Sequence, residues 1–128
     1  MSKKTNKEEQ IKEIKGFPDY YCSNLGNFYT TKVAPRYNPE GEMRPLRPRN
    51  HPSGYLYYGF FVGKGPNKKR IWRRAHRVVY ETHVGKIKYG LQIDHIDGDK
   101  HNNNVTNLRQ LTHSENMLAA WDRKLGRV

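Results

Sequence analysis

The sequence predicts an α+β fold, in which antiparallel hairpins are followed by a strand–loop–strand–helix unit. Three observations lead to this prediction. Segments of strand composition in the first part of the chain are separated by short turns rich in Gly and Asn. A short stretch of helical apolar spacing follows them. Near the end, a polar loop lies between two apolar segments that precede a final helix. We expect two small units, residues 1–74 and 75–128, because a chain of 128 residues is long enough for two units of this size.

Two hairpins are expected in the first unit. Tyr20–Ser23 and Asn27–Thr30 have strand composition, and the intervening NLGN has turn chemistry. Residues 32–52 are rich in Pro, Gly and Arg, so we expect irregular backbone there. The strongest hairpin signal joins Tyr55–Val62 to Lys68–Arg74 through the turn GKGPN.

The second unit begins with a helix in AHRVVYETHVG, residues 75–85. Its expected buried stripe consists of Ala75, Val78, Val79 and Thr82, and Gly85 ends it. The helix also carries His76 and His83. We expect both to be core or hydrogen-bonding histidines rather than metal ligands.

A strand over Leu91–Asp94, a polar loop over residues 96–104 and a strand over Val105–Leu111 come next. A final helix follows, with Thr112 or Ser114 as N-cap, and Thr112 with Glu115 fits a capping box. The apolar face of this helix is expected to consist of Met117, Leu118 and Trp121.

Basic residues outnumber acidic ones by 24 to 12, which gives a formal charge of +12 and predicts an anionic partner. Between Met43 and Arg77 there are ten basic residues and no acidic one. Period-two alternation divides the strand Lys68–Arg74 into two faces. Cations interleaved with aromatic rings suit nucleic acid, although a solvated outer sheet face is the alternative. The predicted DNA-binding residues are Arg44, Arg47, Arg49, Lys68, Lys69, Arg70, Trp72, Arg73 and Arg74.

Several classes of protein are excluded by composition. Cys22 is the single cysteine, so neither an intramolecular disulfide nor a cysteine-rich zinc site is expected. No apolar run approaches membrane-spanning length, and no signal-peptide pattern is present. We therefore expect a cytoplasmic protein that does not act at a membrane.

The stretch DHIDGDKHNNN, residues 94–104, allows three interpretations. An EF-hand calcium loop fails, because neither Asp94 nor Asp97 as first ligand places Gly at position six and Glu at position twelve. Turn chemistry accounts for the acidic and amide residues of the loop. It does not explain Asp94 and His95 at the end of an apolar strand.

A hydrolytic metal site is the third interpretation. Phosphodiester hydrolysis needs an activated water and a cation that neutralises charge on the phosphate. Neutral histidine can accept the proton of water, and a carboxylate with a neutral oxygen ligand suits Mg²⁺. Asp94, His95 and Asn116 would supply these groups if the helix that bears Asn116 packs against the two strands. Because adjacent strand residues point to opposite faces, Asp94 and His95 can serve one cleft only where the strand ends.

Residues 76–116 resemble the HNH endonucleases of the ββα-metal superfamily, most closely the phage and group I intron type. The pattern is a helix that opens with HR-V, followed by DHIDG-K-NN---NL---T--EN. This resemblance implies a ββα-metal (HNH) unit with His95 as general base and with Asp94 and Asn116 as ligands of one divalent ion. It implies that Asn107 pins the loop that orients His95, and that cleavage leaves 5′-phosphate and 3′-hydroxyl ends.

The N-terminal stretch EIKGFPDYYCSNLGNFYT is similar to a module found ahead of HNH domains in homing endonucleases, with Cys22 where Val is usual. Asn116 replaces the second histidine that names the family, which favours Mg²⁺ or Mn²⁺ over softer metals. The chain ends twelve residues after Asn116, so we expect target choice to rest on the Tyr55–Arg74 hairpin and the arginines before it.

These observations predict a metal-dependent endonuclease of the homing type that nicks double-stranded DNA as a monomer or weak dimer, without a small-molecule cofactor. Lys100 or Arg109 could add positive charge near the cleft. Two alternatives stay open at this stage. One is a DNA-binding protein on an inactive HNH scaffold, and the other is a nuclease of phage packaging or restriction.

Overall fold

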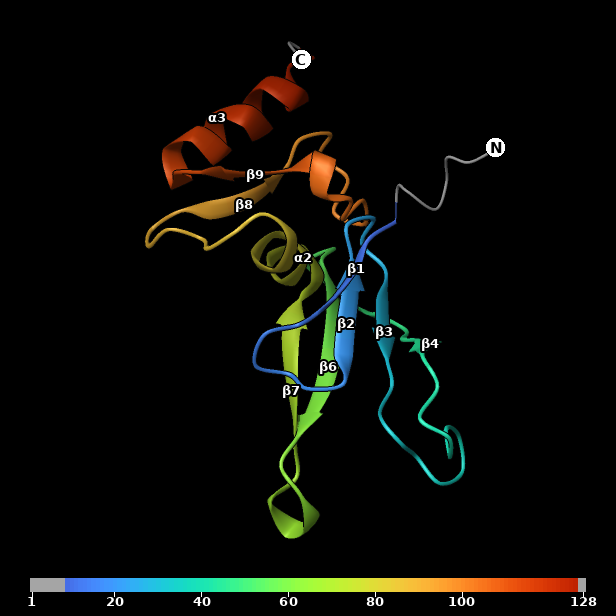
Figure 1. Cartoon of the computed structure of the whole chain (residues 1–128). Helices are drawn as coiled ribbons and strands as arrows, with labels where there is room; N and C mark the ends of the chain where they lie inside the picture. The colour runs from blue at the N-terminus through green and yellow to red at the C-terminus, as the bar shows by residue number, and fades with distance from the viewer. Residues whose placement is uncertain (1–8, 127–128) are drawn as a thin grey trace, which may run out of the picture.

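The computed structural model describes residues 9–126, which form three antiparallel sheets and two α-helices (Figure 1). The first sheet has the order β1 (Ile11–Glu13), β2 (Tyr20–Ser23), β3 (Phe28–Thr30) and β4 (Arg44–Pro45). The predicted first hairpin is thus confirmed, with its second strand one residue shorter.

The second sheet has the order β5 (Arg49–Asn50), β6 (Leu56–Val62) and β7 (Lys69–Arg74). Its β6–β7 hairpin is confirmed, and Gly65–Asn67 form a 3-10 turn at its tip. The tip of the hairpin projects away from the rest of the protein (Figure 1). The expectation of irregular backbone over residues 32–52 is only partly right, because β4 pairs with β3 and β5 pairs with β6.

Aromatic rings hold the first two sheets together. The ring of Phe28 stacks on that of Tyr58 at a centroid distance of 3.9 Å. Phe60 is fully buried, with Phe17 stacked at 4.7 Å and Tyr20 in an edge contact at 5.0 Å. Burying such large rings supplies much of the apolar area that a chain with 34% hydrophobic residues can remove from water.

The helix α2 (Ala75–His83) joins this aromatic core to the second unit. Its buried side consists of Ala75, His76, Val78 and Val79, and it ends just before Gly85, as predicted. Thr82, which was expected in the stripe, is only half-buried. One continuous hydrophobic core therefore extends from the N-terminal sheet to β8 and β9.

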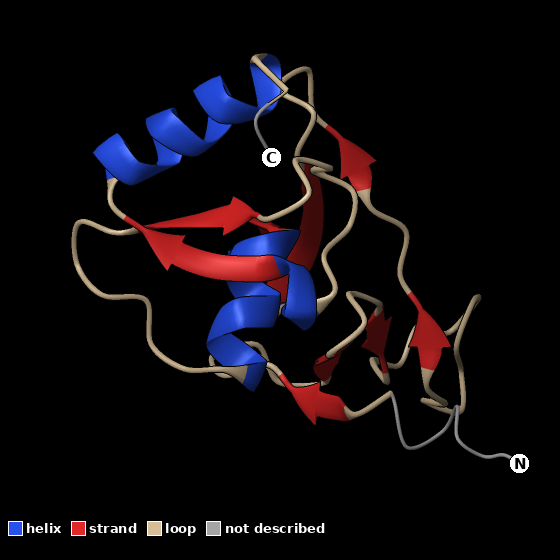
Figure 2. Ribbon diagram, turned by 90° about the horizontal axis from the view of Figure 1, so that it is seen from above, coloured by secondary structure: helices blue, strands red, loops and turns tan. Residues whose placement is uncertain are grey.

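The third sheet pairs β8 (Gln92–His95) with β9 (Leu108–Leu111), and α3 (His113–Lys124) packs against both strands (Figure 2). The predicted strands are corrected at both ends. Gln92 opens β8, which extends through His95. Residues 105–107 form a 3-10 turn instead of a strand, because the Asn104 side chain accepts a hydrogen bond from the Thr106 backbone and caps that turn.

Thr112 caps α3 in a complete capping box with Glu115, as expected. The predicted apolar face is not buried, because Met117, Leu118 and Trp121 are all more than half exposed. The helix instead turns Asn116 and Arg123 toward a pocket at the end of β8. Within residues 9–126, neither α2 nor α3 is long and apolar enough to cross a membrane.

Candidate active site

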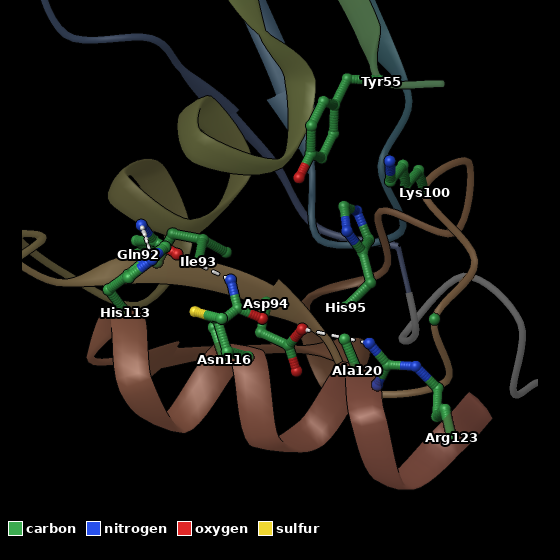
Figure 3. Close-up of a pocket in the computed structure, with 12 residues that line it drawn as sticks. Tyr55, Gln92, Ile93, Asp94, His95, Lys100, His113, Asn116, Ala120 and Arg123 are labelled. Carbon is green, nitrogen blue, oxygen red and sulfur yellow. Dashed lines mark hydrogen bonds and ion pairs between the residues drawn. The ribbon is translucent and has the colours of Figure 1, made fainter. Parts of the chain in front are cut away.

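A pocket of about 270 Å³ lies between the end of β8, the loop after it, and α3 (Figure 3). Asp94, His95 and Asn116 all line it, so three of the four residues predicted for the reaction lie together. The strand alternation raised the question of how Asp94 and His95 could share one site. Asp94 points toward α3 and His95 toward Tyr55 and Lys100, and the pocket lies around the end of the strand (Figure 3).

The chain turns immediately after His95. The backbone N–H of Gly98 donates to the carbonyl of His95 at 2.8 Å, and that of Ile96 donates to the carbonyl of Asn107 at 2.8 Å. Asp94 and His95 are 5% and 4% exposed. The turn thus lets two buried side chains on opposite faces of a strand border the same pocket.

His95 is held by a side chain that sequence reasoning left unassigned. Its Nε2 lies 2.7 Å from Oδ1 of Asn103, and both side chains are buried. An amide oxygen accepts a hydrogen bond, so it selects the tautomer with the proton on Nε2. The Nδ1 atom then keeps its lone pair and can accept a proton.

The ring of His76 packs beside that of His95. Its ring centroid lies 4.9 Å from that of His95, and it stacks on Tyr55 at 4.9 Å with an interplanar angle of 13°. Burial, followed by repulsion from His95 and from Arg74, lowers the pKa of His76 to about 3. His76 is therefore a neutral core histidine, as predicted. His83 is a hydrogen-bonding one, with Nε2 2.9 Å from the carbonyl oxygen of Cys22.

Asn107 lies behind the pocket and binds the loop that follows His95. Its Nδ2 donates to Oδ1 of Asp97 at 2.9 Å and to the carbonyl of Asn102 at 2.9 Å, while its Oδ1 accepts from the Asp97 backbone at 3.0 Å. Hydrogen bonds, first that from Asn102, lower the pKa of Asp97 and keep it ionised. This contact pattern is what the predicted role of Asn107 requires.

Asp94 and Asn116 are suitable ligands for a hard cation. The Nδ2 of Asn116 donates to Oε1 of Gln92 at 2.7 Å, which commits the nitrogen end of the amide and leaves its oxygen as the available donor. Gln92 is fixed in turn by a contact of 3.2 Å between its Nε2 and Nδ1 of His113. One buried carboxylate plus one amide oxygen fits Mg²⁺ or Mn²⁺, with water completing the coordination. Among the described residues no group of three His, Cys, Asp or Glu side chains is placed to hold a metal ion.

Two arginines face the Asp94 carboxylate. The Nε of Arg109 lies 3.0 Å from Oδ2, and Nη2 of Arg123 lies 3.7 Å from Oδ1. Only Arg123 lines the pocket, together with Lys100. Of the two cations named from sequence, Lys100 therefore reaches the pocket and Arg109 does not.

The predicted DNA-binding residues divide between the two faces of the β6–β7 hairpin. We call one the outer face, which presents aromatic rings with cations stacked on them. Arg49 and Arg70 both lie over the Trp72 ring, at 4.6 and 4.5 Å from its centroid, and Arg74 lies over Tyr55 at 5.2 Å. Gly59 makes this packing possible, because a Cβ there would lie 2.6 Å from Nε of Arg70. The outer face comprises Arg49, Tyr57, Phe61, Lys68, Arg70, Trp72 and Arg74.

The other predicted cations lie elsewhere. Lys69 and Arg73 point to the opposite side of β7, where Arg73 lies over Phe17 at 5.8 Å. Arg44 lines a groove shared with Lys68 and Arg70, so it borders the outer face. Arg47 is exposed on the segment between β4 and β5.

Sequence reasoning missed Tyr55, His76, Gln92 and Arg123 as parts of the site and left Asn103 open. Two of these had a detectable signal. Gln92 precedes Asp94 by two residues and so shares its strand face. Arg123 follows Asn116 by seven residues, which places both on one helix face. Tyr55 and His76 had no such signal, because they reach the site through tertiary packing.

Nucleases of the ββα-metal class place a histidine and a carboxylate at the end of the first strand and a metal ligand on the helix. In this protein Asp94 and His95 lie at the end of β8 and Asn116 lies on α3, so the side chains have the same placement. Residues 73–118 match the HNH endonuclease family. The matched region, which includes α2, β8, β9 and the first half of α3, is an HNH endonuclease domain.

Known relatives match most of the chain. It is 30% identical over 116 residues to an uncharacterized HNH endonuclease of Acanthamoeba polyphaga mimivirus, a match that covers 91% of this chain and 32% of the relative. It is 34% identical over 107 residues to the DNA endonuclease I-HmuI of Bacillus phage SP01, covering 83% of this chain and 54% of the relative.

A solved structure of the HNH homing endonuclease I-HmuI, described as showing DNA binding and cleavage, superimposes with a TM-score of 0.66 at 29% identity. The match covers 93% of this chain and 60% of that one. The likeness therefore includes the N-terminal sheets as well as the HNH domain. The chain spans about a third to about half the length of the two curated relatives.

Proposed function

We propose that the protein is a divalent-metal-dependent DNA endonuclease of the homing type, which cuts one strand of double-stranded DNA. One observation carries this proposal. His95 is fixed by Asn103 in a buried position at the same pocket that Asp94 and the Asn116 amide line. A structural histidine needs no such combination of a selected tautomer and neighbouring oxygen ligands.

The substrate path follows from a continuous series of cations and rings. Lys100 lies in the pocket with its Nζ 4.6 Å above the Tyr55 ring, and Arg74 covers the same ring from β7. The outer face continues from Arg74 through Trp72 toward the hairpin tip. Phosphate contacts from these cations would position the duplex, and a two-stranded ribbon is narrow enough to enter a major groove.

His95 accepts a proton from a water molecule through Nδ1. The water oxygen attacks phosphorus in line with the 3′ oxygen, and the P–O3′ bond breaks. The departing 3′ oxygen takes a proton from solvent water, so the products carry 5′-phosphate and 3′-hydroxyl ends. Asp94 and Asn116 would hold one Mg²⁺ or Mn²⁺, and such an ion would supply positive charge for the phosphate and the leaving oxygen. Asn107 keeps the loop after His95 in place while the base acts.

A single active site per chain cuts one strand, so we propose nicking by a monomer or weak dimer, without an organic cofactor. We propose that the protein acts in the cytoplasm of a bacterial host, where the DNA lies, and the match to a nuclease of a Bacillus phage supports this location. Residues 1–74 and 75–128 remain our proposed division into a DNA-binding unit and a nuclease unit.

The proposal is tested by incubating the protein with supercoiled plasmid or phage DNA in Mn²⁺ and in Mg²⁺, with an EDTA control. We expect metal-dependent conversion to open circles, which the His95→Ala protein loses. DNA that is bound tightly but never cut, whichever substrate is used, would favour an inactive HNH scaffold instead.

A further inference from the structure

Arg123 is the only arginine that lines the pocket within the described residues, and its position is closely defined. Its Nη1 donates to the carbonyl of Ile96 at 3.4 Å, and its Nη2 faces Oδ1 of Asp94 at 3.7 Å. The backbone of Gly98 makes room for it, because a Cβ there would lie 2.7 Å from Nε of Arg123. Figure 3 shows the guanidinium reaching from α3 to the carboxylate.

The neighbouring cations have other contacts. Lys100 donates from Nζ to the carbonyl of Ser53 at 2.7 Å. Arg109 forms a hydrogen bond of 3.0 Å to Oδ2 of Asp94, borders a second groove that Arg123 also lines, and has a side chain that is 41% exposed. Arg109 therefore fixes one carboxylate oxygen from the sheet, whereas Arg123 faces the other oxygen from inside the pocket.

Oδ1 of Asp94 is thus the oxygen for which Arg123 and a divalent cation would compete. It is the oxygen that a divalent cation would take, since Oδ2 is already bonded to Arg109. A guanidinium and a divalent cation repel each other at one oxygen. A distance of 3.7 Å is an ion pair without a good hydrogen bond, so this contact breaks more readily than that of Arg109.

We propose that Arg123 holds Oδ1 of Asp94 while the metal is absent and transfers to a non-bridging oxygen of the scissile phosphate in the loaded enzyme. The inference rests on the proposed nuclease function. Phosphate suits Arg123, because a planar guanidinium can bind two phosphate oxygens at once and stabilises the charge that grows on them as the bond breaks. Arg123 is then both a competitor of the metal and a catalytic residue.

The two roles predict opposite effects of one substitution. Arg123→Ala removes the competing charge, so we expect Mn²⁺ to bind the DNA-free protein about 3- to 10-fold more tightly in calorimetric titration, equivalent to about 0.7–1.4 kcal/mol. The same variant loses the phosphate contact, so we expect cleavage at saturating Mn²⁺ to slow about 100-fold. Arg123→Lys, which keeps the charge, should retain wild-type Mn²⁺ affinity and part of the cleavage rate.

Lys124→Ala is the matched control, because it removes the same charge one residue away, where Lys124 lies over the exposed Trp121 ring. Lys124→Ala should change neither the Mn²⁺ affinity nor the cleavage rate. Circular dichroism should show that every variant is folded. Weaker, unchanged or undetectable Mn²⁺ binding by Arg123→Ala would overturn the inference, as would unimpaired cleavage. Failure of the nuclease proposal is distinguishable, because wild-type protein would then cut no DNA while the titration still reports on Arg123.

Discussion

The hydrogen bond between Asn103 and His95 decides which nitrogen of the base is free. Asn103→Ala removes the acceptor of a buried Nε2 proton and lets the ring rotate or change tautomer. We expect kcat to fall at least about 10-fold with little change in KM, because substrate contacts are intact. The ¹⁵N chemical shifts of His95 should change from those of the Nε2–H tautomer.

Asn104→Ala is the control for this substitution, because Asn104 lies in the same loop and its side chain, among the described residues, bonds only Thr106 in the 3-10 turn. Its kcat and its His95 ¹⁵N shifts should match wild type. If Asn103→Ala left the tautomer and kcat unchanged, Asn103 would be a loop residue with no part in positioning the base.

The lowered pKa of His76 predicts that the protein loses stability in acid. Its pKa is lowered from 6.5 to about 3 in the folded protein, so below pH 6.5 the unfolded chain binds a proton that the folded one does not. The contribution of neutral His76 to the free energy of unfolding is therefore complete above pH 6.5. It is lost as pH falls toward 3, by at most about 1.4 kcal/mol per pH unit. His76→Phe keeps a ring against Tyr55 and removes the titration.

Denaturant unfolding at several pH values measures this effect. The free energy of unfolding of His76→Phe should fall less steeply between pH 6.5 and 4 than that of wild type. His95, Arg74 and Arg77, the charged or titratable neighbours that act on His76, are the same in both proteins. Equal slopes would mean that His76 is not desolvated in the way its burial implies.

At the scale of elements, the two faces of β7 provide a matched pair of substitutions. Arg70 stacks on Trp72 on the outer face, whereas Arg73 points to the other side. Arg70→Ala should weaken DNA binding by about 1 to 3 kcal/mol and reduce the salt dependence by about one ion, while Arg73→Ala should do little. Titration of labelled duplex at several salt concentrations measures both, and equal losses would contradict the proposed DNA path.

The start of α3 gives another prediction at this scale. Thr112 accepts from the Glu115 backbone at 3.1 Å, and Glu115 accepts from the Thr112 backbone at 2.9 Å. Thr112→Ala should lower the free energy of unfolding by about 1 kcal/mol, and Thr112→Ser should restore it. Thermal unfolding followed by circular dichroism distinguishes these outcomes, and an unchanged melting temperature would show that the cap contributes nothing.

Some elements could be predicted because local chemistry decides them. The capping box, the end of α2 before Gly85 and the β6–β7 hairpin follow from neighbouring residues. Residues 105–107 resembled a strand but form a 3-10 turn, because the Asn104 cap outweighs the preference of Val105 and Thr106 for strands. The short strands β4 and β5 form only by pairing with distant segments, which no local pattern reveals.

The candidate site likewise combines residues that could be predicted from local sequence with residues that could not. Asp94, His95 and Asn116 belong to a sequence pattern, and their meeting at one pocket could be predicted from it. Tyr55 and His76 come from the hairpin and α2, and they meet His95 only through long-range packing. The orientation of the cations that we predict to bind DNA depends on strand register, which separates Arg70 from Arg73.

At the scale of the whole molecule, one core connects the N-terminal sheets to the HNH domain. Phe28 and Tyr58 join the first two sheets, and Val79 on α2 shares the core with Ile93 and Leu108. The outer face of the hairpin is thereby held in a fixed relation to the pocket. A duplex that lies along that face would reach the base without rearrangement of the fold.

The central claim is that His95 is the general base of a metal-dependent DNA nuclease, and chemical rescue tests it most directly. Single-turnover cleavage of an end-labelled duplex would be followed for wild type and His95→Ala in Mn²⁺, with and without added imidazole. We predict that the substitution slows cleavage at least about 100-fold and that imidazole restores part of the rate by entering the vacated space. Cleavage by His95→Ala at the wild-type rate would contradict the account.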